Sequence, residues 1–142
     1  MSRTTAWLIH LSALGLGVTG MVYGWLRYFT DPVDEFAVYN HPSEPGLRDV
    51  HLLLAPLCLF LWGVVWRSHV WARFRGGMQK RRRTGIALMA LVLPMVLSGY
   101  MLQVAVDESL RQLWIWTHGI TGSGWILLYA LHQLGPRSQE AD

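Results

Sequence analysis

The sequence has little charge and almost no cysteine. Of its 142 residues only 15% are charged, while 52% are hydrophobic. The single cysteine, Cys58, cannot form a disulfide within the chain, and the lack of a Cys-x-x-Cys-His segment excludes covalent attachment of a c-type haem. The sequence also has no nucleotide-binding motif and no group of cysteines suited to an iron–sulfur cluster. These absences exclude a disulfide-linked scaffold and indicate that the chain cannot oxidise most substrates alone.

Four long apolar stretches account for the hydrophobic composition. They cover residues 6–29, 47–69, 85–106 and 110–134. Each is close to the ~20 residues that a helix needs to cross the hydrocarbon layer, and none alternates as a membrane β-strand does. We therefore predict an all-α membrane protein, a single domain over residues 1–142 whose four transmembrane helices form an up-down bundle. The last residues, 135–142, are predicted to be a disordered tail.

Most of the basic residues lie in one connection. Between the second and third stretches the sequence has Arg67, Arg73, Arg75, Lys80, Arg81, Arg82 and Arg83. The positive-inside rule places this connection in the cytoplasm, and with four helices both termini are then cytoplasmic as well. Topology thus explains the net charge of +3 without a nucleic acid partner. Membrane lipid is the predicted partner, with anionic headgroups beside the basic connection.

Histidines occur at matching depths in three of the stretches. His10 lies near the cytoplasmic end of the first stretch and His51 near the outer end of the second. His118 and His132 are fourteen residues apart in the fourth, so they share a helix face and differ in depth by about 21 Å. The level pairs are therefore His10 with His132 and His51 with His118. Intramembrane ionisable residues mark functional sites, and a b-type haem needs an axial nitrogen on each side of its iron. We predict that the bundle encloses two b-type haems.

Glycines near these histidines allow two interpretations. Gly17 and Gly24 follow His10 at seven-residue steps, so they lie on nearly the same helix face. In the fourth stretch, three glycines lie between the two histidines: Gly119, Gly122 and Gly124. Such glycines leave room either for a flat macrocycle or for close helix packing, for which Gly20 and Gly24 form a small-x-x-x-small pair.

In these positions the sequence resembles the four-helix di-haem cytochrome b superfamily, which includes bacterial cytochrome b561 and the cytochrome b subunits of membrane formate dehydrogenases and nickel–iron hydrogenases. The resemblance rests on His10 in the segment Trp7-Leu8-Ile9-His10-Leu11, on His51 in Val50-His51-Leu52, and on the spacing of His118 and His132. It covers nearly the whole chain and lies in positions rather than in a signature string. It implies quinone-linked electron transfer across a prokaryotic cytoplasmic membrane. It also implies a subunit that serves a redox protein or catalytic subunit on the outer face, rather than a stand-alone enzyme.

The sequence departs from that family in its minimal loops and in an additional histidine. His69 lies eighteen residues after His51, on the same face and about 27 Å away. It competes with His10 for the inner haem, but its spacing exceeds that of the fourth stretch by about one turn, so His10 is preferred. His69 then serves as a proton relay beside a quinone or as a plain interfacial residue. His41, between Asn40 and Pro42, is predicted to be an exposed loop residue.

Polar residues near the two haem levels are the remaining site candidates. On the cytoplasmic side the candidates for a quinone or proton site are Arg67, Ser68, His69 and Gln133. On the outer side Arg27, Arg48 and Arg111 can pair with haem propionates. Any one of these arginines, taken alone, is better explained as an interfacial anchor.

Two other functional classes stay open at this stage. A transporter for a metal ion or for protons would use the same histidines, but would gather them at one depth together with acidic residues. A haem-free membrane anchor would need no histidines at matching depths. Bound haem colours a protein red, so its colour separates the cytochrome from both.

Overall fold

The computed structural model describes residues 2–76 and 82–134, except for the side chains of Ser68 and Arg73. These residues form helices and no strand, which confirms the prediction of an all-α protein. The four long helices are α1 (Arg3–Tyr28), α2 (Glu44–Val65), α4 (Arg82–Val104) and α5 (Glu108–Leu134). Two short segments continue α2, namely the π-helix η1 (Trp66–Trp71) and α3 (Ala72–Arg75). The predicted tail, 135–142, lies outside the described residues, as do Lys80 and Arg81.

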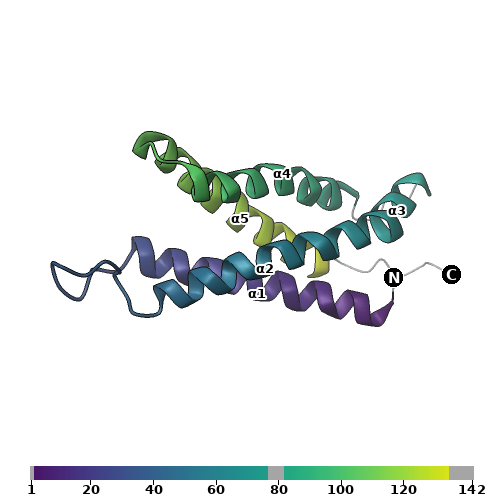
Figure 1. Cartoon of the computed structure of the whole chain (residues 1–142). Coiled ribbons are helices and arrows are strands. Elements are labelled where there is room, and N and C mark those ends of the chain that lie inside the picture. Colours follow the sequence, from purple (N-terminus) through teal and green to yellow (C-terminus); the bar gives the residue numbers. More distant parts are fainter. Residues whose placement is uncertain (1, 77–81, 135–142) are drawn as a thin grey trace. The chain divides into compact units, whose positions relative to one another are not determined.

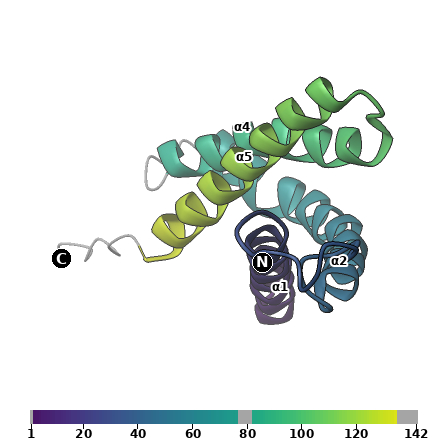
Figure 2. The same ribbon diagram turned by 90° about the vertical axis from the view of Figure 1, so that its left-hand side faces the viewer.

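The long helices are arranged as two helical hairpins (Figures 1 and 2). Helix α1 packs against α2, and α4 packs against α5. The first hairpin lies within residues 1–76 and the second within residues 77–142. Small residues bring α1 close to α2, since an added Cβ at Gly15 would lie 3.3 Å from the Leu54 side chain. Nearby, the Ser12 hydroxyl lies 3.8 Å from the Cys58 sulfur. The antiparallel register of this hairpin is thereby set.

Polar caps explain where the helices begin. The Ser2 hydroxyl accepts a hydrogen bond from the Thr5 N–H at 3.1 Å, and the Asp107 carboxylate accepts one from the Leu110 N–H at 2.9 Å. Proline in the first turn, as at Pro45, lacks the N–H that a helix start leaves without an acceptor. Helices α1, α2 and α5 consequently begin two or three residues before their apolar stretches, which start at residues 6, 47 and 110.

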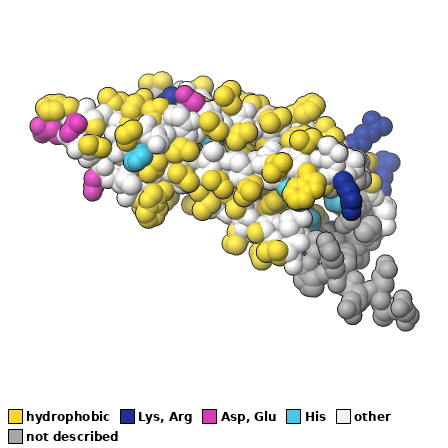
Figure 3. Space-filling view, turned by 90° about the horizontal axis from the view of Figure 1, so that it is seen from below, with side chains coloured by type: hydrophobic (Ala, Val, Ile, Leu, Met, Phe, Trp, Pro, Cys, Tyr) yellow, Lys and Arg dark blue, Asp and Glu magenta, His cyan; other side chains and the backbone are white. Residues whose placement is uncertain are grey.

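Three of the long helices have the length and composition to cross a membrane. They are α1, the continuous helix formed by α2 and η1, and α4. Helix α5 has 27 residues, but its histidines and glutamines make it more polar, and it does not join that set. In the three helices no more than 17% of the most apolar window is buried, and hydrophobic side chains predominate on the face in Figure 3. Because so much apolar surface is exposed, the structure indicates a membrane protein.

Candidate functional site

The imidazole of His51 on α2 lies against the backbone of α1. Its Nδ1 is 3.1 Å from the main-chain oxygen of Leu16 and 3.2 Å from the hydroxyl of Thr19. That hydroxyl donates its own hydrogen to the Gly15 oxygen at 2.8 Å, so its lone pairs are available to the imidazole. Gly20 makes the approach possible, because a Cβ there would lie 2.6 Å from the Cε1 atom of His51.

His118 on α5 meets α4 in the same manner. Its Nδ1 is 3.0 Å from the main-chain oxygen of Met95 and 3.2 Å from the hydroxyl of Ser98. The Ser98 side chain is fully buried and donates to the Pro94 oxygen at 2.6 Å. A Cβ at Gly99 would lie 3.2 Å from the Cε1 atom of His118. The second hairpin thus repeats the arrangement of the first.

His132 also contacts α4, but near the opposite end of the hairpin from His118. Its Nδ1 lies 2.9 Å from the hydroxyl of Thr84. The next residue along α4 is again a glycine, and a Cβ at Gly85 would be 3.7 Å from the Cε1 atom of His132. Three of the four predicted haem ligands are therefore held through Nδ1 by a neighbouring helix of their own hairpin.

The hydrogen-bond partners determine which ring nitrogen carries the hydrogen in His51 and His118. A carbonyl oxygen can only accept, so Nδ1 is the donor in both rings. In a neutral imidazole with its hydrogen on Nδ1, the lone pair is on Nε2, the nitrogen that can bind a metal or take up a proton. Histidines that ligate metals almost always make such a bond from their other nitrogen. Each of the two rings could therefore bind a metal through Nε2.

The fourth predicted ligand, His10, and its competitor, His69, lie at different levels of the first hairpin. His10 is half-buried on α1, with the Trp7 ring edge-on at 6.2 Å between centroids. His51 contacts α1 around residue 18, so His10 lies about 12 Å from that level, whereas His69 lies about 27 Å from His51. The spacing of about 21 Å between His118 and His132 falls between these values. The register thus weakens the preference for His10 that sequence spacing alone gives.

The π-helix that carries His69 also borders a pocket. This pocket is an open surface hollow of about 350 Å³, lined in the described part of the chain by Trp66, Arg67 and Trp71. The guanidinium carbon of Arg75 lies 4.9 Å from the centre of the Trp71 ring. Turns of π-helix occur frequently at functional sites. Of the predicted quinone-site residues, Arg67 lines this pocket, His69 is half-buried on the same turn, and Gln133 is exposed on α5; the side chain of Ser68 is not described.

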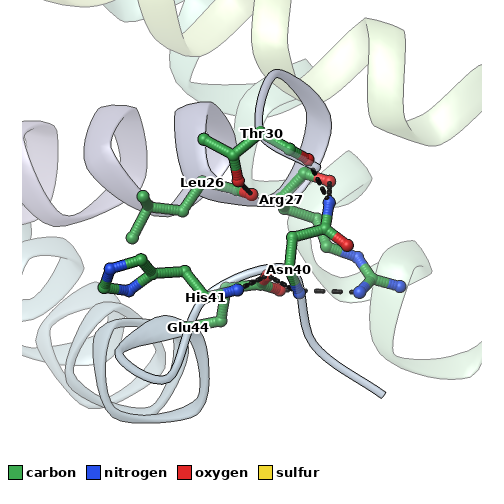
Figure 4. Close-up of polar contacts among 6 residues, drawn as sticks. All are labelled: Leu26, Arg27, Thr30, Asn40, His41 and Glu44. Atoms are coloured by element: carbon green, nitrogen blue, oxygen red, sulfur yellow. Dashed lines mark hydrogen bonds and ion pairs between the residues drawn. The ribbon is translucent and has the colours of Figure 1, made fainter. Parts of the chain in front are cut away.

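Arg27, a predicted propionate contact, takes part in the network that holds the loop of the first hairpin (Figure 4). Its Nη1 lies 3.5 Å from the carboxylate of Glu44, which is only 1% exposed. That carboxylate accepts the main-chain N–H groups of Asn40 at 2.6 Å and of His41 at 3.1 Å. The Asn40 amide in turn donates to the main-chain oxygens of Arg27 and Thr30, at 3.0 and 2.7 Å. The network joins the loop to both helices.

The other two predicted propionate contacts are exposed arginines with local partners. Arg48 is 3.1 Å from the exposed carboxylate of Asp49. Arg111 donates to the main-chain oxygen of Leu102 at 3.3 Å. His41 is exposed in the loop, as the sequence predicts, and its Nδ1 accepts the Ser43 N–H at 3.1 Å.

Sequence reasoning misses the hydroxyl groups that contact the histidines, those of Thr19, Thr84 and Ser98. It also pairs Gly20 with Gly24 for helix packing, whereas the structure places the His51 ring against Gly20. Among the described residues, no atom lies within 4 Å of a Cβ added at Gly24, Gly119 or Gly122. A Ser-Gly or Thr-Gly pair on a helix next to a histidine is the signal that could have found these contacts. The pair is not specific, because Thr121-Gly122 shows it without a histidine ring against it.

Within residues 2–76 and 82–134, no group of three or more His, Cys, Asp or Glu side chains is placed to hold a metal ion. The axial positions of a b-type haem require two imidazoles only. Comparisons of the chain with protein-family models, with curated proteins and with solved structures gave no match.

Proposed function

We propose that this chain is a di-haem b-type cytochrome that carries electrons across a prokaryotic cytoplasmic membrane. The observation that supports this most strongly is the pair of hydrogen bonds from Nδ1 of His51 and His118 to main-chain oxygens. These bonds leave Nε2 as the nitrogen with the lone pair and fix the plane of each ring.

The two hairpins would together form the four-helix bundle, and each would provide one imidazole to each haem. His51 and His118 would hold the outer haem, while His10 and His132 would hold the inner one. Haem iron supplies one-electron chemistry when it is bound, and the protein orients the group and tunes its potential. The chain's own contribution is to hold the rings at a fixed angle and to surround them with apolar helices. The glycine positions leave the rings room to lie against the neighbouring helix.

The same proposal gives the chain an orientation and partners. The basic residues of η1, α3 and the start of α4 would face the cytoplasm, as the positive-inside rule predicts. A redox protein or catalytic subunit would then exchange electrons with the outer haem, and quinone with the inner one. Arg27, Arg48 and Arg111 lie at the opposite end of their helices, where propionates of the outer haem would be accessible to them.

The pocket on the π-helix is the proposed quinone site. Its tryptophan walls suit a flat ring, and Arg67 provides hydrogen-bond donors for a carbonyl oxygen. His69, on the same turn, would pass a proton to or from the quinone. Anionic lipid headgroups would contact the neighbouring Arg75 and the basic connection that follows it.

Optical spectra of the full chain, purified in detergent from a host with confirmed haem supply, test this function. We expect two b-type haems in the wild type, and an unchanged spectrum for the exposed-loop control His41→Ala. His51→Ala and His118→Ala should lose the same haem, and His10→Ala and His132→Ala the other. His69→Ala should retain both haems and oxidise a quinol more slowly.

Two results would change the proposal. Loss of the inner haem in His69→Ala, with His10→Ala unaffected, would make His69 the ligand and leave the cytochrome function in place. A colourless wild type would overturn that function. It would favour a histidine-based transporter of metal ions or protons, or a haem-free membrane anchor.

A further inference from the structure

We propose that three dipeptides, Thr19-Gly20, Thr84-Gly85 and Ser98-Gly99, are imidazole seats that position the histidine ligands and set the haem potentials. By an imidazole seat we mean a hydroxyl group within hydrogen-bonding distance of Nδ1 of a histidine on the neighbouring helix, followed by a glycine beside the ring. The effect on potentials rests on the proposed function. The effect on ring tautomer and orientation does not.

The seats of His51 and His118 have the same construction to the residue. In the first, the accepting atoms are the oxygen of Leu16 and the hydroxyl three residues later, with the glycine next. In the second, the oxygen of Met95 is again followed three residues later by a hydroxyl and then by glycine. Residues three and four apart lie on one helix face, so carbonyl, hydroxyl and glycine all face the same ring.

In each of these two seats, the hydroxyl hydrogen is directed away from the histidine. Thr19 donates to the Gly15 oxygen at 2.8 Å, and Ser98 donates to the Pro94 oxygen at 2.6 Å. A hydroxyl has one hydrogen, so both oxygens meet Nδ1 as acceptors. Each Nδ1 hydrogen therefore has two acceptors at 3.0–3.2 Å, the carbonyl and the hydroxyl.

The seats give specific residues control over iron chemistry. Hydrogen bonding at Nδ1 raises the basicity of the ligating nitrogen and fixes the ring orientation. A more basic ligand favours the ferric state, so removal of an acceptor should raise the midpoint potential of that haem. Thr19 and Ser98 contact the two proposed ligands of the outer haem, whereas Thr84 contacts a proposed ligand of the inner one.

The test uses hydroxyl deletions of similar shape, Thr19→Val, Ser98→Ala and Thr84→Val. Thr19→Ser restores a hydroxyl to the first seat. Thr121→Val is the matched control, because its hydroxyl bonds to the Thr117 oxygen of its own helix at 2.6 Å and, in the described part of the chain, no ring lies within 4 Å of a Cβ at Gly122. Redox titration follows the haems, and nitrogen-15 NMR of the haem-free chain, with histidines labelled, follows the Nδ1 hydrogens.

We expect the haem-free wild type to show His51 and His118 protonated on Nδ1, with slow exchange of these hydrogens with solvent. Thr19→Val should speed this exchange for His51, and Ser98→Ala for His118. In the loaded protein both deletions should raise the potential of the same haem and lower haem affinity about tenfold, the low end of the ~10–100-fold seen when such partners are lost, since the carbonyl remains. Thr84→Val should act on the other haem, and Thr19→Ser should behave as wild type.

Protonation of either ring on Nε2 in the haem-free chain would overturn the inference. So would exchange rates and potentials in Thr19→Val and Ser98→Ala equal to those in Thr121→Val. A wild type that takes up no haem but shows the expected exchange rates would refute the cytochrome function and leave the seats in place.

Discussion

Three glycines lie against a described histidine ring, namely Gly20, Gly85 and Gly99. Substitution by alanine should displace the ring most at Gly20, where the ring is that of His51. The added Cβ would lie 2.6 Å from Cε1 and 3.1 Å from Nδ1 of His51. Ordinary contacts begin at 3.4 Å, so the ring must retreat by about 0.8 Å, the difference between 2.6 and 3.4 Å. The same retreat would lengthen the 3.1 Å bond from Nδ1 to the Leu16 oxygen to about 3.9 Å, beyond hydrogen-bonding distance.

The other two seats provide a graded comparison. At Gly99 the added Cβ would lie 3.2 Å from the His118 ring, so a shift of about 0.2 Å suffices, and at Gly85 the distance of 3.7 Å is an ordinary contact. Loss of the hydrogen bond to the non-ligating nitrogen of a metal-bound histidine typically lowers metal affinity ~10–100-fold. We therefore expect a loss of that size for Gly20→Ala, a small loss for Gly99→Ala and none for Gly85→Ala.

Titration of haem into the haem-free chain in detergent would measure these affinities. Gly63→Ala is the control, because Gly63 lies inside α2 and a Cβ there would meet no described atom within 4 Å apart from its own helix backbone. It carries the same gain in helix propensity, about 1 kcal/mol, as Gly20→Ala does. Equal haem affinity in the two variants would refute the reasoning, because the clash at Gly20 would then have no consequence for the ligand.

Two further predictions concern the first hairpin. Glu44→Ala removes the acceptor of two partly buried main-chain N–H groups. A fully buried group left unsatisfied costs about 1–3 kcal/mol and one that water reaches costs less, so we expect the Tm in detergent to fall by several degrees. Asp49→Ala, at an exposed ion pair, should leave the Tm unchanged, and equal Tm values for the two variants would contradict the loop network. Cys58 is 6% exposed between α1 and α2, so a maleimide should modify it slowly until denaturant is added, and equal rates before and after would mean that these helices do not pack as described.

The helices follow from the sequence because apolar runs of membrane length have few other conformations available to their main chain. The four long helices therefore match the four apolar stretches. Helix α5 is long enough to cross a membrane, but it is more polar than the other three. Its two predicted haem ligands, His118 and His132, are polar residues that lower the mean hydropathy of the helix. The residues on which the proposed function depends therefore weaken the membrane signal of this helix.

The seats do not follow from the sequence, because they depend on how two helices are aligned. Thr19 precedes His51 by 32 residues, and a shift of one turn between α1 and α2 would place another residue against the ring. Periodicity gives the face of a helix but not its alignment with a neighbour. For the same reason the sequence alone predicts that Gly20 serves helix packing, and only the structure shows that the His51 ring lies against it. The buried state of Glu44 likewise depends on the course of a loop that no periodic pattern describes.

Each imidazole seat joins two helices of the same hairpin, which has a consequence for the order of assembly in the membrane. A hairpin can orient its imidazoles as soon as its two helices pair, before the other hairpin has been synthesised or has inserted. The conformational entropy of the histidine side chains is then lost when the hairpin forms. Under the proposed function, haem would bind to rings that are already oriented, and a defect in one hairpin should leave the rings of the other correctly aligned.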